Sequence, residues 1–118
     1  MNSDSTTIDE AAALAALNGD RQLLCELAQI FVEDAPTLLE EVDAALATEQ
    51  IDVARRLVHS LRGLSSTFFA SPSTEIAKRL EEAASKGQIE VLRDGGVERL
   101  KIAFNELGER LRIAGLAR

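Results

Sequence analysis

The chain has 118 residues, which suits one domain, and 46% of them are hydrophobic, enough for a core. Its aromatic residues are four Phe, so the core must be aliphatic, and the abundant Ala, Leu and Glu favour helix. A formal net charge of −7 argues against nucleic-acid binding, which normally requires a basic face. The single cysteine, Cys25, excludes an internal disulfide. Since neither a membrane span nor a signal peptide is apparent, we expect a cytoplasmic location.

The chain begins with polar residues 1–8, which predict a flexible tail ahead of one domain over residues 9–118. A short apolar pattern from Ile8 predicts a minor first helix that stops at the sequence NGD. Asp20 then has the residue type and position of an N-cap for a long helix. Pro36 interrupts that helix, but the apolar spacing continues beyond it, so we expect a kink rather than a new helix.

The second half of the chain predicts three further helices. The sequence TEQID indicates a turn, with Asp52 capping a helix that runs to about Phe69. Ser71 as a cap and Pro72 at the first helical position indicate the next helix, which stops at Gly87. The sequence QIEVLRDGG is compatible with a helical turn and loop, or with the frayed start of the last helix. The last helix carries a heptad-like apolar stripe, formed by Val97, Leu100, Phe104, Leu107 and Leu111.

These elements predict an all-α fold. Four amphipathic helices joined by short connections bury their apolar stripes best as an antiparallel four-helix bundle. The short extra N-terminal helix would cover one end of this bundle. No segment has the alternating pattern of a β-strand, and the sequence contains no glycine-rich phosphate loop.

His59 is the only histidine of the chain and lies in the sequence RRLVHSLRG. At about 100° per residue, the apolar positions of its helix share one face and His59 falls on the opposite one, so its imidazole should lie in solvent. Gly63 removes a side chain one turn away, which leaves the ring open to a large partner, and Arg62 could pair with an anion on His59. The full set of neighbours on this face comprises Arg55, Arg56, Arg62, Gly63 and Ser66.

An exposed imidazole with cationic neighbours and an open approach suits phosphoryl chemistry. Cations favour the neutral, nucleophilic ring, and they stabilise a phosphoryl group once it is attached. One histidine and one distant cysteine do not make a metal site, so we expect neither a metal nor a cofactor. The sequence also contains no nucleophile elbow that would indicate Ser-His-Asp catalysis.

The sequence HSLRG, followed by SS and then by IAKRLEEAASKG, resembles the histidine-containing phosphotransfer (Hpt) domain of bacterial phosphorelays. That family shows His, two residues, Lys and Gly, and then a second helix with an Ala and a Leu-Glu pair. His59 matches the phosphorylated histidine and Gly63 the small residue one turn later. The second-helix pattern is matched by Ala77, Leu80 and Glu81. The proline-containing helix before His59 also resembles the family, so the resemblance covers about residues 9 to 112.

Two regions depart from the pattern of this family. Arg62 stands where the family has Lys, which keeps the charge but changes its geometry. Phe69 and Ser73 stand where a glycine and a leucine are common. Phe69 falls on the flank of the histidine face, so either the end of the helix differs or this side chain contributes to docking.

The resemblance implies a phosphorelay intermediate without kinase machinery of its own. His59 would accept a phosphoryl group at Nε2 from the aspartate of one receiver domain and pass it to the aspartate of another. The partners would be response-regulator receiver domains, including one in a hybrid histidine kinase, and the receiver would supply Mg²⁺ and an acidic pocket. This chain would act as a monomer. The residues facing the partner would be Gly63, Arg55, Arg56, Ser66 and Phe69.

Two other functions are compatible with an exposed histidine on a helical bundle. The dimerisation and phosphoacceptor domain of sensor kinases has an acid directly after its His and a Thr-Pro after the basic residue, where this chain has Ser60 and Gly63. A non-catalytic helical adaptor, in which His59 is incidental, predicts that replacing His59 leaves every activity intact.

Overall fold

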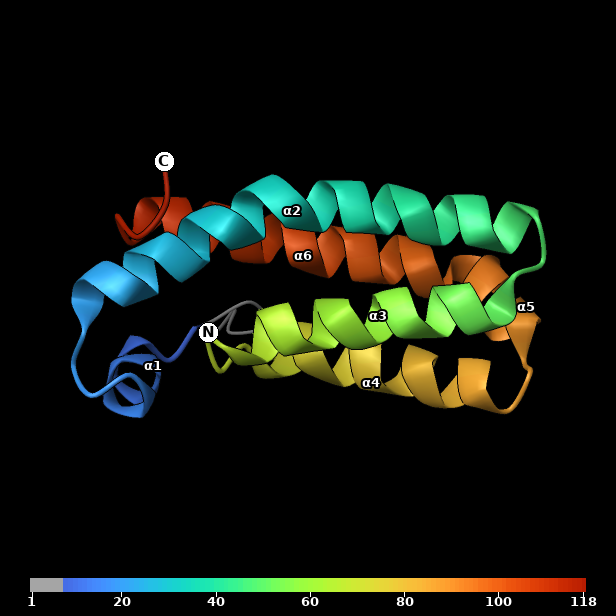
Figure 1. Cartoon of the computed structure of the whole chain (residues 1–118), viewed down its shortest axis with the longest axis horizontal. Helices are drawn as coiled ribbons and strands as arrows, with labels where there is room; N and C mark the ends of the chain where they lie inside the picture. The colour runs from blue at the N-terminus through green and yellow to red at the C-terminus, as the bar shows by residue number, and fades with distance from the viewer. Residues whose placement is uncertain (1–7) are drawn as a thin grey trace.

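The computed structural model describes residues 8–118, and these form a bundle of antiparallel helices (Figure 1). The elements in chain order are α1 (Glu10–Ala16), α2 (Arg21–Ala47), α3 (Ile51–Ser66), α4 (Ser71–Ser85), α5 (Ile89–Val91), η2 (Leu92–Gly96) and α6 (Val97–Ile113). The long helices α2, α3, α4 and α6 each run opposite to the one before, and α3 packs between α2 and α4. The predicted four-helix bundle with a short N-terminal helix is confirmed.

The helix α1 lies at the end of the bundle where α3 ends (Figure 1). The backbone N–H of Asp9 donates to the carbonyl of Phe68 at 3.1 Å, which ties the entrance of α1 to the α3–α4 connection. Ile8 already packs against the core, and the rest of the tail predicted over residues 1–8 lies outside the described residues. None of the helices in residues 8–118 combines the length and apolarity that crossing a membrane requires.

The start of α2 and its path agree with the sequence predictions. The Asp20 carboxylate accepts the backbone N–H of Leu23 at 3.0 Å, which is the N-cap hydrogen bond expected of this residue type. Pro36 lies inside one continuous helix, so the alternative of a new helix at this point is wrong. A proline is accommodated here at the loss of one backbone hydrogen bond, because the apolar residues on both sides pack into the same core.

The N-cap residues of α3 and α4 lie one or two positions earlier in the chain than predicted. Gln50 occupies the N-cap position of α3, and Asp52 lies within the first turn instead of capping it. There its carboxylate still favours the positive end of the helix dipole. Likewise Ala70 is the N-cap of α4, so Ser71 is its first residue and Pro72 its second. The C-terminal end of α4 agrees with the prediction, since the helix ends at Ser85 and its C-cap, Lys86, directly precedes Gly87.

The connections on either side of α4 differ from the expected course. The helix α3 ends at Ser66, and Phe69 has a φ of +54°, which lies in the left-handed region and cannot continue a helix. The segment QIEVLRDGG forms α5 and the distorted turn η2, in which Asp94 and Gly95 leave helical geometry. The segment thus contains a helical turn, α5, and a distorted turn that leads directly into the last helix, so each of the two predicted alternatives describes part of it.

The core is aliphatic around a group of three phenylalanines. Phe31 of α2 stacks on Phe104 of α6 with ring centroids 5.4 Å apart, and it meets Phe68 edge-on at 5.8 Å. The apolar stripe predicted for the last helix is buried throughout. These contacts hold α2, α6 and the end of α3 together, and they fix α3 with its polar face outward.

Candidate functional site

His59 lies on the outer face of α3, as the helical projection predicted. Its side chain is 58% exposed, whereas Ala54 and Leu61 on the opposite side of the same helix are buried. The apolar face of α3 packs against α2 and α4, so the rotation of the helix leaves the imidazole at the surface. The packing of the bundle therefore presents this ring to solvent.

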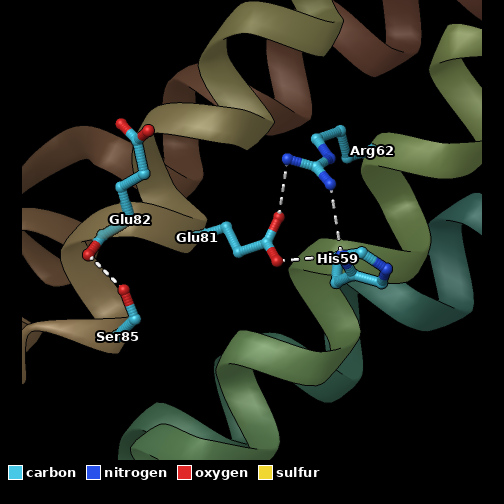
Figure 2. A network of polar contacts seen from close by, with 5 residues as sticks. All are labelled: His59, Arg62, Glu81, Glu82 and Ser85. Atoms are coloured by element: carbon cyan, nitrogen blue, oxygen red, sulfur yellow. Dashed lines mark hydrogen bonds and ion pairs between the residues drawn. The ribbon is translucent and has the colours of Figure 1, made fainter.

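A carboxylate from the neighbouring helix holds one nitrogen of the imidazole. Glu81 of α4 places Oε2 2.8 Å from Nδ1 of His59 (Figure 2). The Glu81 side chain is only 17% exposed, so this contact lies mostly below the surface while the rest of the ring lies above it. Figure 2 shows the second ring nitrogen, Nε2, on the side away from Glu81. One nitrogen is thus engaged and the other is accessible.

Arg62 completes a three-residue cluster with His59 and Glu81. Its Nη1 lies 3.2 Å from Oε1 of Glu81, and its Nη2 lies 3.5 Å from Nδ1 of His59 (Figure 2). The projection places Arg62 on the solvent-facing side of the helix, but its guanidinium is half-buried and rests on the carboxylate. It therefore pairs with an anion that the chain itself supplies.

The distances in this cluster assign the proton on the imidazole. An N–H of Arg62 can point at Nδ1 only if Nδ1 is an acceptor, whereas Glu81 can bind Nδ1 only if Nδ1 carries a proton. The Glu81 contact at 2.8 Å is a strong hydrogen bond, and the Arg62 contact at 3.5 Å is at the limit of one. We therefore assign the proton to Nδ1, which leaves the lone pair of a neutral ring on Nε2.

The electrostatic surroundings of His59 differ from the sequence prediction. The charged atom closest to the ring belongs to the Glu81 carboxylate, which the prediction of cationic neighbours did not include. The projection of one helix could not reveal a group that another helix supplies 22 residues later. A signal was present in the Leu-Glu pair of the family resemblance, which includes Glu81 but does not say what it contacts.

The remaining predicted residues are distributed along α3. Gly63 is exposed one turn from His59, and a Cβ atom there would meet no heavy atom of the described residues within 4 Å. Ser66 is exposed and donates its hydroxyl to the Gly63 carbonyl at 3.0 Å. Arg55 is half-buried and Arg56 exposed, both on the turn before His59, and Phe69 lies beyond the end of the helix. The structure thus gathers Arg62 and Gly63 at the ring, with the other residues further along the same helix.

The described part of the chain brings together no three His, Cys, Asp or Glu side chains that could hold a metal ion. The site consists instead of one accessible imidazole nitrogen, one carboxylate and one guanidinium. Such an arrangement can present a nucleophile to a partner and can balance the charge of a group attached to it.

Comparison with known families agrees with this arrangement. The sequence model of the Hpt domain matches residues 26–110, a span that includes His59, Arg62, Gly63 and Glu81. No curated protein and no solved structure matches the chain. Because the Hpt match covers more than half of the chain, and the fold is the expected helical bundle, the chain belongs to the Hpt domain family.

Proposed function

We propose that His59 accepts a phosphoryl group at Nε2 from the aspartyl phosphate of one receiver domain and passes it to the aspartate of another. Membership of the Hpt family supports the class of activity, since Hpt domains take part in histidine phosphotransfer in phosphorelays. The observation that supports His59 in particular is its engaged Nδ1, at 2.8 Å from Glu81, together with its exposed opposite edge.

The proposed step exchanges one bond to phosphorus for another. The lone pair of Nε2 attacks the phosphorus of the aspartyl phosphate, the N–P bond forms, and the P–O bond to the aspartate breaks. The aspartate leaves as a carboxylate, and the ring keeps its proton on Nδ1. The ring therefore gains positive charge as it reacts, and the Glu81 carboxylate at Nδ1 offsets that charge. Transfer to the second receiver follows the same path in reverse.

Arg62 has a separate part in this proposal. In the unphosphorylated protein its guanidinium rests on Glu81, 3.2 Å from Oε1. A phosphoryl group on Nε2 adds about two negative charges close by, and a guanidinium binds such an anion well. Arg62 then stabilises the phosphorylated state, whereas Glu81 acts as a positioning residue that fixes the ring.

The partner side of the proposal follows from family membership. Hpt domains interact with receiver domains in phosphorelays, and a hybrid histidine kinase is the source we propose for one of them. The receiver would supply an acidic pocket with its Mg²⁺, and Gly63 would let that pocket approach the ring. Arg55, Arg56 and Ser66 would lie against it. A monomeric state and a cytoplasmic location complete the proposal.

The test is phosphoryl transfer from a phosphorylated receiver domain to the purified chain. We expect a label that is labile in acid and stable in base, as phosphohistidine is, and no label in His59→Gln. A chain that accepts no label from any receiver, or a His59→Gln variant that is still labelled, would overturn the proposal. Binding of receivers without transfer would instead favour the adaptor function.

The role of Glu81 is tested by Glu81→Ala. Loss of the hydrogen bond to Nδ1 should slow transfer by about tenfold, the equivalent of one hydrogen bond of roughly 1.4 kcal/mol. The nitrogen chemical shifts of His59 should at the same time change from the Nδ1–H form to a mixture of the two tautomers. A slower reaction with unchanged shifts would contradict a positioning role, and Glu81→Gln should restore the tautomer because its amide oxygen also accepts.

A further inference from the structure

Phe69 has a conformation and a location that do not favour an aromatic residue. Its φ of +54° lies in the left-handed region, where a side chain is disfavoured and glycine is not. The residue is also 47% exposed, although a phenylalanine gains most by complete burial. The left-handed backbone lowers the stability of the fold, which a glycine would avoid, and about half of the residue remains outside the core.

The fold requires the turn but not the ring. The backbone N–H of Phe69 donates to the Ser66 carbonyl at 3.0 Å, which closes the turn after α3. The preceding residue, Phe68, is buried against Phe31, so the core contact of this connection is made by Phe68. The backbone of any residue tolerant of the left-handed region could close this turn. The Phe69 side chain therefore points to a role outside the fold.

The position of Phe69 places it at the edge of a surface centred on His59. The helix α3 continues for seven residues beyond His59, about 10 Å along its axis, and Phe69 follows three residues after the helix ends. Gly63 and Ser66, which lie between them in the sequence, are both small and exposed. A protein interface that buries about 800 Å² on each side is roughly 30 Å across, and a partner centred on His59 would reach Phe69.

The charges of the helices indicate where a partner with an acidic pocket would dock. The helix α3 carries three arginines and one aspartate, whereas α2 carries one arginine and six acidic residues. Arg55 and Arg56 lie on the side of His59 towards the start of α3, and Phe69 lies on the other side. The surface is thus basic at one end and apolar at the other, which would fix the orientation of a partner as well as its position.

We propose that Phe69 is an apolar anchor for the receiver domain, an inference that rests on the proposed function of His59. The partner would place its acidic pocket over His59 and an apolar patch against Phe69, beyond the end of α3. The exposed part of the ring would be buried in the complex. Phe69 would therefore contribute to receiver affinity and to the choice among receivers, without taking part in the transfer itself.

Glu49 provides a matched control for Phe69. It has a φ of +58° in the turn that follows α2, and it also lies ten residues from His59, but in the opposite direction. Phe69→Gly and Glu49→Gly therefore relieve the same backbone strain at the same sequence separation from His59. Glu49→Gly also loses a 4.0 Å contact with Arg93, an exposed ion pair of little consequence.

The experiment measures the dissociation constant of each variant for a receiver domain, and then the rate of phosphoryl transfer against receiver concentration. Phe69→Gly should stay folded, because relief of the left-handed backbone offsets the lost burial of about half of the side chain, and it should bind the receiver about tenfold more weakly. Its transfer rate at saturating receiver should stay within about twofold of the wild type, because the imidazole is unchanged. Glu49→Gly should melt at a higher temperature than the wild type with unchanged receiver affinity, and Phe69→Leu should keep most of the affinity.

Equal affinities of Phe69→Gly and the wild type would overturn the anchor, and so would an equal loss of affinity in Glu49→Gly. Phosphoramidate, a small phosphoryl donor that needs no docking surface, should label His59 equally in all these variants. If a receiver binds the wild type without transferring a phosphoryl group, the proposed function fails, and the affinities of the two glycine variants still decide the role of Phe69. If no receiver binds the wild type, the anchor fails as well.

Discussion

The two helix pairs of the bundle, α3 with α4 and α2 with α6, are built differently. The first pair carries a polar cluster on its surface, in which Glu81 of α4 contacts both His59 and Arg62 of α3. The second pair is joined through the stacked rings of Phe31 and Phe104. Beside these rings is a cavity of about 130 Å³, and its lining includes Pro36 and Gly108.

This difference separates the requirements of stability from those of chemistry. Ion pairs at a surface contribute little to folding, so the contacts of His59, Arg62 and Glu81 are better explained by the chemistry of the imidazole. Buried aromatic rings contribute much, and those of α2 and α6 lie away from the outer face of α3. Substitutions in the second pair should therefore change the free energy of unfolding, and substitutions on the outer face of the first pair should change phosphoryl transfer.

The largest effect on stability is expected for Phe31→Ala. Its ring is buried and contacts both Phe104 and Phe68, so its removal leaves a cavity at the junction of α2, α6 and the end of α3. We expect a loss of about 3–5 kcal/mol in the free energy of unfolding, measured by urea denaturation. The folded fraction should still be labelled by phosphoramidate at His59. A loss below about 1 kcal/mol would contradict the central place of this ring.

Most of the fold was predictable because the three- and four-residue spacing of apolar residues identifies amphipathic helices. The heptad-like stripe of the last helix is buried as predicted, and Asp20 caps α2 as its residue type requires. The ends of α3 were not predictable, because they depend on contacts between elements. Ser65 is fully buried, contrary to its polar character, since its hydroxyl contacts those of Ser73 and Thr74 at the start of α4. That interaction stabilises the connection between α3 and α4, and it cannot be predicted from the sequence of α3 alone.

The candidate site was predictable to the extent that one helix determines it. A projection of α3 alone places His59 at the surface and Gly63 beside it, and the structure agrees. The projection could not supply Glu81, because the rotation of α4 against α3 sets that contact. The same limit explains Arg62, which the projection places on the outer face of α3 and which lies on the Glu81 carboxylate.

The glycines of the two pairs provide the next test. Gly63 in α3 faces solvent, whereas Gly108 in α6 faces α2, and a Cβ atom there would lie 3.8 Å from Cγ1 of Val32, an ordinary contact. Replacing either with alanine should stabilise the protein by about 0.5–1 kcal/mol, because glycine weakens a helix. A side chain at Gly63 should affect receiver docking, whereas one at Gly108 should not. The larger side chain of Gly63→Leu should block docking.

Thermal denaturation and receiver titration of the three glycine variants check this expectation together. A loss of stability in Gly108→Ala would mean that α2 and α6 cannot accommodate a methyl group at that approach. Normal transfer by Gly63→Leu would show that the space beside His59 has no part in docking.

The smallest effect is expected for the surface ion pair of the second helix pair, between Lys101 of α6 and Asp43 of α2. Its hydrogen bond to Asp43 raises the pKa of Lys101 above its ordinary value, and the nearby charge of that carboxylate acts in the same direction. A raised folded-state pKa means that the pair stabilises the fold fully below the ordinary pKa of lysine. The stabilisation is lost as the pH rises through the folded-state pKa.

The free energy of unfolding of the wild type and of Lys101→Gln should accordingly differ at pH 9 and converge towards pH 12. Because both groups are partly exposed, we expect a difference of only about 0.5 kcal/mol at pH 9. The chain contains no tyrosine, so phenol ionisation does not interfere in this range. A difference that grew with pH would mean that Lys101 is more stabilising when neutral, which its contact with a carboxylate does not allow.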